Sequence, residues 1–107
     1  MREEIIPAVY MMASKRNGTL YTGVTSNLWH RVATHKDGSV AGFTQTNGVK
    51  FLVWYEFHDT MESAIHREKQ IKEWKREWKI KRIVEFNPVW HDLHEEIDYD
   101  LPRYLNP

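Results

Sequence analysis

Residues 21–35 (YTGVTSNLWHRVATH) constrain the fold more than any other stretch, because a strand pattern gives way to a helix pattern within them. Residues 20–24 alternate as a strand does, and their apolar positions are expected to face the core. Tyr21 and Gly23 then share the opposite face. Because Gly23 has no side chain, we expect room beside the tyrosine for a ligand to approach the backbone.

The helix that follows is expected over residues 27–36, with Ser26 supplying the N-cap oxygen. Its apolar positions face the core, while Arg31 and His35, four residues apart, line a neighbouring stripe. The strand and the helix therefore bring their polar side chains to one edge. This arrangement is typical of an active-site corner.

Composition limits the number of domains and the class of protein. The chain has 107 residues, no cysteine and a formal net charge of zero. This length suits one compact core, and without cysteine neither disulfides nor thiolate metal ligands can contribute. No apolar run approaches the ~20 residues that a membrane helix needs. We expect one domain, no membrane contact and a cytoplasmic location.

A second strand is expected over residues 9–13, joined to the first by a turn that contains Asn17-Gly18. Antiparallel pairing places Tyr10 on the same face as Tyr21. Their spacing depends on the loop, because a two-residue turn would put Tyr10 opposite Thr25, whereas a wider loop could put it opposite Tyr21. The shared face is therefore the prediction, and the spacing stays open.

The rest of the chain predicts one more strand and two more helices. Residues 36–50 are rich in small polar residues and are expected to form a mobile loop with Phe43 as its one apolar anchor. The run FLVWYEF, at residues 51–57, is typical of a strand at the centre of a sheet. Helices are expected over residues 61–74 and 76–86.

The order β-β-α-β-α-α predicts an α+β fold, in which a small three-stranded, mainly antiparallel sheet is flanked by helices. We place the core at about residues 8–93 of a single domain that spans 1–107. Residues 94–107 are then an acidic C-terminal tail.

Glu68 is the second informative feature. It falls in the middle of a helical stripe whose other members are Met61, Ala64, Ile65, Ile71 and Lys72. An inward carboxylate needs a cation or strong hydrogen-bond donors, because burying it without a partner costs several kcal/mol. Glu68 is therefore either a functional group or one half of a structural ion pair with Arg31 or a lysine.

The charges are unevenly spread although their sum is zero. Residues 67–82 hold eight Lys or Arg against three Glu, and residues 92–100 hold five acids and no Lys or Arg. The basic run is interleaved with Trp74 and Trp78, which favours contact with a phosphate backbone. A solvated helical surface would have the same composition.

Several motifs together resemble the GIY-YIG endonuclease family. They are Ala8-Val9-Tyr10, Tyr21-Thr22-Gly23, Arg31 and His35 on the next helix, and Glu68 within REKQIK. The resemblance covers about residues 8–93. It is strongest to the small stand-alone bacterial members, which are related to the N-terminal domain of the excision-repair nuclease subunit. Ala8 replaces the first glycine of the family pattern, and Thr22 replaces the middle residue of its second motif.

The resemblance implies a set of functional residues. The catalytic residues would be Tyr10, Tyr21, Arg31, His35 and Glu68, and Glu68 would hold Mg²⁺ or Mn²⁺. In this interpretation the tyrosines position the attacking water, and His35 accepts or relays a proton from Tyr21. Nucleic acid, DNA rather than RNA, would contact Gly23, Lys36, Lys69, Lys72, Lys75, Arg76 and Lys79. Asn87 is the only candidate for the late asparagine of the family.

Two functions follow from these residues. The first is a metal-dependent endonuclease that hydrolyses DNA phosphodiester bonds, with branched or damaged DNA as candidate substrates. The second is a non-catalytic domain that keeps the nuclease fold and binds nucleic acid. The sequence leaves the choice between them open.

Overall fold

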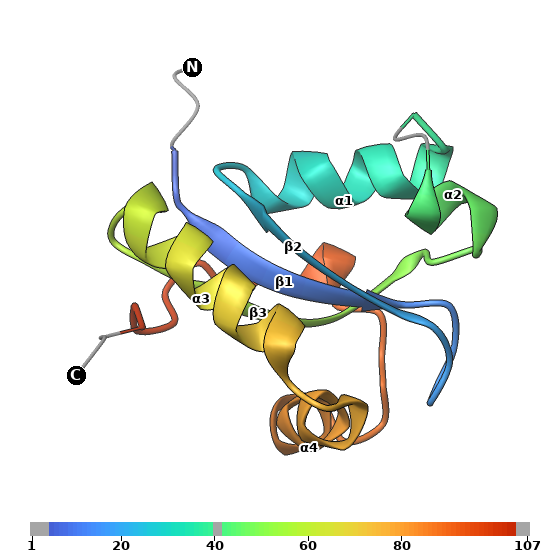
Figure 1. Cartoon of the computed structure of the whole chain (residues 1–107). Helices are drawn as coiled ribbons and strands as arrows, with labels where there is room; N and C mark the ends of the chain where they lie inside the picture. Colours follow the sequence, from blue (N-terminus) through green and yellow to red (C-terminus); the bar gives the residue numbers. More distant parts are fainter. Residues whose placement is uncertain (1–4, 40–41, 105–107) are drawn as a thin grey trace.

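The computed structural model describes residues 5–39 and 42–104 and has an α+β fold, as predicted (Figure 1). The sheet has the strand order β2-β1-β3, and both pairings are antiparallel. In chain order the elements are β1 (Ala8–Ala13), β2 (Leu20–Thr25), α1 (Leu28–Asp37), α2 (Phe43–Thr46), β3 (Phe51–Phe57), α3 (Met61–Glu73), α4 (Arg76–Phe86) and a 3₁₀ turn (His94–Glu96).

β1, and not β3, is the central strand. Every residue of β1 is buried, and it pairs with both other strands. The prediction that residues 51–57 lie at the centre was wrong, because β3 is an edge strand whose two faces are both covered. A continuous apolar run indicates that both faces of a strand are buried. An edge strand can also be buried on both faces when other segments cover it. The Leu93 and Tyr104 N–H groups hydrogen-bond β3 carbonyls at its two ends.

The loop between β1 and β2 is wider than a two-residue turn. Ser14 and Thr19 close it through a backbone hydrogen bond of 3.0 Å, and Asn17 takes the left-handed conformation with φ 57°. Tyr10 therefore lies opposite Gly23. Tyr21 stands two residues before Gly23 in β2, so the tyrosines share a face as predicted and are diagonal neighbours.

α1 is capped by Asn27 and not by Ser26. The Asn27 side chain accepts a hydrogen bond of 3.2 Å from the His30 N–H. The Ser26 carbonyl instead accepts from the Ile6 N–H at 3.1 Å, which ties the start of the chain to the end of β2. Two residues with similar capping ability stand side by side in the sequence, so composition alone did not separate them.

The segment between α1 and β3 contains α2, where the sequence predicted a loop anchored by Phe43. Thr44 and Val49 are the buried residues of this segment, whereas Phe43 is 49% exposed. The prediction that Phe43 is the anchor of this segment was therefore wrong. Thr44 can be buried in its place because its hydroxyl group hydrogen-bonds another side chain. Residues 40–41 lie outside the described part.

Helices cover both faces of the sheet (Figure 1). α1 packs on the face that carries Tyr10 and Met12, and α3 and α4 pack on the face that carries Val9 and Met11. α4 has the predicted bounds, and α3 ends one residue before the predicted position. Among residues 5–39 and 42–104, no helix has the length and apolar character that crossing a bilayer requires.

The C-terminal segment packs on the sheet and is not a tail outside the core. Leu93, Ile97 and Leu101 contact the apolar cluster around Tyr10 and Phe57. These apolar residues alternate with the acids along the segment, which lets it bury one side and expose its charges. Residues 105–107 lie outside the described part.

Candidate active site

The candidate active site begins with the contact between Tyr10 and Gly23. Tyr10 is fully buried, and its ring lies across the strand next to it. A Cβ atom added at Gly23 would lie 2.6 Å from both Cζ and Oη of Tyr10, which is closer than any ordinary contact. Gly23 therefore makes room for the Tyr10 ring, whereas we expected it to make room for a ligand.

A chain of hydrogen bonds runs from Tyr10 through His35 to Thr44. The Tyr10 hydroxyl lies 2.9 Å from His35 Nε2, and His35 Nδ1 lies 3.0 Å from Thr44 Oγ1. Both His35 and Thr44 are buried. The two ring nitrogens of His35 are thus both engaged, which sets its orientation in the site.

Burial shifts the pKa values of this chain in opposite directions. The pKa of Tyr10 is raised to about 12, mainly by burial and also by the nearby Tyr21 and Glu68, although hydrogen bonding from Arg31 and its charge act in the opposite direction. Burial and the Arg31 charge hold the pKa of His35 below its ordinary value. At neutral pH Tyr10 is therefore protonated and His35 is a neutral imidazole.

Tyr21 is the more accessible of the two tyrosines. It is half-buried, and its ring centroid lies 6.3 Å from that of Tyr10 and 5.3 Å from that of His35. The exposed ring of Phe43 stacks on it at 6.2 Å. We expected His35 to take a proton directly from Tyr21. In this structure Nε2 of His35 hydrogen-bonds the Tyr10 hydroxyl instead.

Arg31 and Glu68 approach Tyr10 from helices on opposite faces of the sheet. Arg31 comes from α1 and hydrogen-bonds the Tyr10 hydroxyl, and Glu68 comes from α3, which packs against β2 and β1. The Glu68 side chain is only 13% exposed and lies 3.1 Å from Lys72 Nζ, whose side chain is 51% exposed. Arg31 and Glu68 thus act on Tyr10 from the two sides of the sheet, and Tyr21 and His35 lie beside it.

The stripe that we predicted around Glu68 was only partly correct. Ala64 and Ile71 are buried, but Ile65 is 39% exposed and Lys72 is also exposed. The third buried position of α3 is Arg67, whose guanidinium bonds the Glu56 carboxylate at 3.0 and 3.4 Å. A buried arginine is stable here because its charge is paired, and apolar periodicity does not anticipate such a pair.

Comparison with known proteins assigns the family. Residues 6–81 match the family described as GIY-YIG catalytic domain. The chain belongs to the GIY-YIG family. A UPF0213 protein of Staphylococcus haemolyticus is 40% identical over 77 residues, which are 72% of this chain and 93% of that protein. A UPF0213 protein of Clostridium perfringens is 37% identical over 90 residues, covering 84% and 96%.

A solved structure is also similar to this chain. The solution NMR structure of a UPF0213 protein from Bacillus halodurans has 27% sequence identity and a TM-score of 0.46, and the match covers 77% of this chain and 85% of that one. Membership of the GIY-YIG family supports a nuclease-type function.

The two departures from the GIY-YIG pattern lie in the core. Ala8 is fully buried between its partners in β2 and β3, and Thr22 is 5% exposed and pairs with Met11, on the face that α3 and α4 cover. Neither side chain belongs to the group around the Tyr10 hydroxyl. The changes therefore affect packing beside the site and leave its polar groups in place.

The residues at this GIY-YIG corner fit a divalent cation held by one carboxylate. Among the described residues, no three His, Asp or Glu side chains come close enough to form a metal cluster. Mg²⁺ commonly takes one or two carboxylates and fills its other positions with water and phosphate oxygens. Glu68 can supply such a carboxylate. Its ion pair with the half-exposed Lys72 contributes little stability, so it would compete only weakly with a metal ion.

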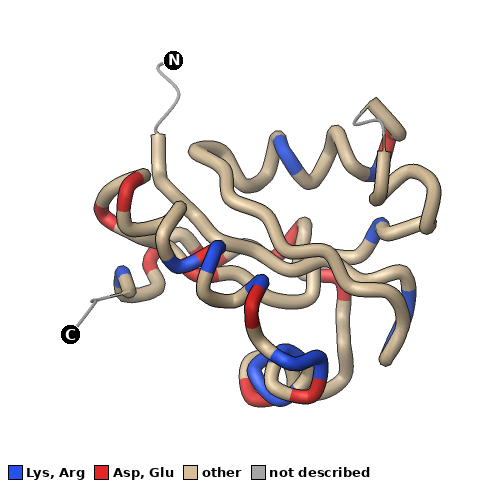
Figure 2. Tube along the Cα trace, viewed as in Figure 1, with Lys and Arg blue, Asp and Glu red and all other residues tan. Residues whose placement is uncertain are grey.

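The expected nucleic-acid contacts separate into free and engaged side chains. Lys69 and Lys75 are exposed and Lys79 is half-buried. Lys36 pairs with Asp92, and Arg76 donates hydrogen bonds of 2.8 and 2.6 Å to the Asn17 and Gly18 carbonyls. Figure 2 shows Lys and Arg on α3, on α4 and on the β1–β2 loop.

Asn87 has structural contacts. It is 5% exposed, and its amide group donates hydrogen bonds of 3.2 and 2.7 Å to the carbonyls of Val53 and His91. Its side-chain oxygen accepts from the His91 N–H at 3.0 Å. These bonds hold the end of α4 against β3, so Asn87 is engaged as a helix terminator.

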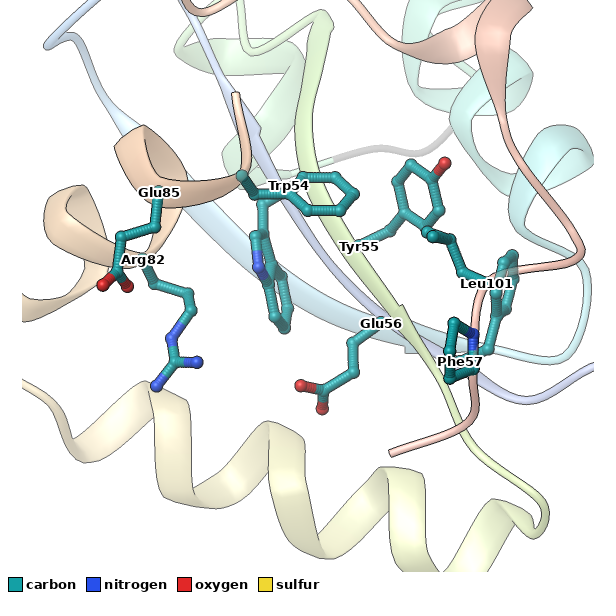
Figure 3. A pocket seen from close by; sticks show the side chains of 9 residues that line it. Trp54, Tyr55, Glu56, Phe57, Arg82, Glu85 and Leu101 are labelled. Atoms are coloured by element: carbon teal, nitrogen blue, oxygen red, sulfur yellow. The ribbon is translucent and has the colours of Figure 1, made fainter. Parts of the chain in front are cut away.

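Sequence reasoning missed Thr44 and the contact of Phe43 with Tyr21. Both depend on α2 folding back on α1, and a helix as short as α2 has no periodic signal in the sequence. A well-formed pocket of about 310 Å³ lies elsewhere, along β3 between α4 and the C-terminal segment (Figure 3). Trp54, Phe86 and Leu101 are among the residues that line it, and it shares no residue with the candidate active site.

Proposed function

We propose that this protein is a metal-dependent endonuclease that hydrolyses DNA phosphodiester bonds. The observation that carries the proposal is the convergence of Tyr21, Arg31 and Glu68 around the buried Tyr10 hydroxyl. Hydrolysis of a phosphodiester needs a proton acceptor for the attacking water and positive charge at the phosphate. This corner supplies a group for each need, and branched or damaged DNA is the proposed substrate.

In this proposal the two tyrosines have different tasks. Tyr10 is buried, its pKa is raised to about 12, and it is bonded to His35, so it keeps its proton and orients the groups around it. Tyr21 is half-buried and can contact water. Its hydroxyl oxygen positions the attacking water and, as the general base of this proposal, takes its proton.

Arg31 and Glu68 act on the phosphate. Arg31 binds a non-bridging oxygen through its planar donor group and stabilises the charge that develops there. Glu68 would hold Mg²⁺ or Mn²⁺, and a bound divalent ion would supply a Lewis acid at the phosphate. Glu68 comes from α3 and Arg31 from α1, so the phosphate would lie between the two helices at the β2 edge of the sheet.

His35 has an indirect task. We assign the tautomer in which the Tyr10 O–H donates to Nε2 and the Nδ1–H donates to Thr44 Oγ1, which is one of the two arrangements that a neutral imidazole can satisfy. His35 thereby fixes the direction of the Tyr10 hydroxyl, whose oxygen accepts from Arg31. The result is an oriented guanidinium at the place where the phosphate binds.

The test is cleavage by the wild-type protein. Supercoiled plasmid and labelled branched oligonucleotides are incubated with Mg²⁺, with Mn²⁺ and with EDTA, at several salt concentrations. Cleavage with either metal and none in EDTA supports the proposal. Binding without cleavage under all conditions would contradict it and would favour the non-catalytic nucleic-acid-binding domain.

We predict that Thr44→Val slows cleavage by about tenfold, less than the loss of a direct general acid or base, and leaves DNA affinity unchanged. Valine keeps the volume but removes the partner of His35 Nδ1, so the imidazole loses its fixed tautomer. Thr44→Ser keeps the hydroxyl and should restore most of the rate. Equal rates for the valine variant and the wild type would show that the bond to His35 does not matter for cleavage.

A further inference from the structure

α4 carries a tryptophan that the fold does not use. Trp78 is 62% exposed, although its helix buries Ile83 and half-buries Ile80. These two residues mark the face of α4 that packs on the sheet, and Trp78 lies two and five residues away from them, on the opposite side of the helix. More than half of this residue therefore faces solvent, where its aromatic surface can contact a ligand.

The surroundings of Trp78 are basic. Lys75 and Lys81 are exposed and each lies three residues from it, so they flank the ring on the helix surface. Glu85 follows one turn after Lys81 and ends the basic part of α4. The ring therefore lies among cations over the first two turns of the helix.

The β1–β2 loop extends this surface. The hydrogen bonds from Arg76 to the Asn17 and Gly18 carbonyls hold the loop against the beginning of α4. Lys15 and Arg16, which precede these carbonyls, are exposed. We define the α4 platform as Lys15, Arg16, Lys75, Trp78 and Lys81.

The end of α3 links the candidate active site to the α4 platform along the chain. Lys72 pairs with Glu68 and stands one residue before the end of α3, and α4 begins three residues after α3 ends. A polyanion whose phosphate lies at Glu68 can thus follow Lys72 towards Trp78. Fixed cations along the path together with an exposed aromatic ring match the way proteins bind single-stranded nucleic acid.

We infer that Trp78 is a stacking platform for an unpaired base, and that the preferred substrate is DNA with a single-stranded stretch beside the cleaved bond. This inference rests on the proposed function. A duplex keeps its bases stacked inside and offers Trp78 only its phosphates and sugars. An unpaired base offers a free ring face, and the charges of the α4 platform hold the backbone on either side of it.

The experiment measures affinity in EDTA, so that no substrate is cut. Fluorescence anisotropy is recorded with labelled single strands, full duplexes and duplexes with a single-stranded overhang. Trp78→Ala is expected to weaken binding of the single strand and the overhang by about tenfold, the typical effect of one lost base stack. Duplex binding should change by less than about twofold, because phosphate contacts remain.

Three controls make the result specific. Trp78→Phe keeps an aromatic face and should retain most of the affinity, whereas Val84→Ala, at an exposed position of the same helix outside the platform, should have no effect. The salt dependence gives a separate readout. Trp78→Ala should leave the log–log salt slope unchanged, and Lys81→Gln should lower it by about 0.7 for a single strand. Circular dichroism confirms that each variant is folded.

The outcomes separate this inference from the proposed function. If the wild type binds DNA and Trp78→Ala binds the single strand equally well, or loses affinity equally for the duplex, the stacking role is wrong and the proposed function is untouched. If the wild type binds none of the DNA probes, the proposed function and this inference both fail.

Discussion

Glu68→Gln is expected to abolish metal-dependent cleavage while the protein stays folded. Glutamine has the shape of glutamate but lacks the charge that would hold a divalent ion at the phosphate. A Lewis acid at this position is worth several kcal/mol, which corresponds to a loss of ~10³-fold or more in rate. The pair with the half-exposed Lys72 is also lost, at a cost of only a few tenths of a kcal/mol.

Glu73→Gln is the matched control, because Glu73 is exposed on the same helix. Rates are measured at increasing Mg²⁺ and Mn²⁺, and unfolding is followed by urea titration. A Glu68→Gln variant that cleaves at the wild-type rate in saturating Mg²⁺ would exclude Glu68 as the metal ligand.

Gly23→Ala is the second change with a large expected effect. The added Cβ would lie 2.6 Å from Cζ and Oη of Tyr10, whose ring is buried and bonded to His35 and cannot move without disturbing both. Overpacking of this kind costs about 1–3 kcal/mol of folding free energy. Cleavage should also fall by about 10²-fold or more, because Tyr10, His35 and Arg31 are displaced together.

A double-mutant cycle with Tyr10→Leu isolates the contact. In the leucine background the space over position 23 is open, so the alanine should cost less stability than it does beside Tyr10. Unfolding free energies of the four proteins are compared. An equal cost in both backgrounds would mean that the glycine serves some purpose other than admitting the tyrosine ring.

The elements that the sequence predicted well are those with local signals. α4 has its predicted bounds because Asn87-Pro88 stops a helix wherever it occurs. The shared face of Tyr10 and Tyr21 follows from the two-residue period of a strand and does not depend on the loop. The convergence of Arg31, His35 and Glu68 with the tyrosines rested on the family resemblance, and their chemical roles stay predictions.

What could not be predicted depends on contacts between distant segments. β3 looked central because both of its faces are covered, and no local pattern distinguishes that from pairing on both edges. Thr44 was missed because its importance comes from His35 nine residues earlier. Arg67 occupies a buried position of α3 because its charge is paired with Glu56. A search for apolar periodicity cannot find a buried position that a charged pair fills.

The central claim is that Tyr21 acts on the water that attacks the phosphate. Tyr21→Phe removes one hydroxyl and almost no volume, so folding free energy should change by no more than about 1 kcal/mol. Arg31→Ala is expected to weaken both DNA binding and cleavage, because its guanidinium also contacts the phosphate in the ground state. Tyr21→Phe should affect cleavage alone, which makes it the sharper variant.

The most direct measurement is the single-turnover cleavage rate of Tyr21→Phe, with DNA affinity determined in parallel. Tyr99→Phe serves as the control, since Tyr99 is 40% exposed on the C-terminal segment, outside the candidate active site. We predict that Tyr21→Phe cleaves about 10²-fold more slowly or worse and binds DNA as the wild type does. If the wild type cleaves and Tyr21→Phe cleaves equally fast, Tyr21 is a packing residue and the proposed mechanism is wrong.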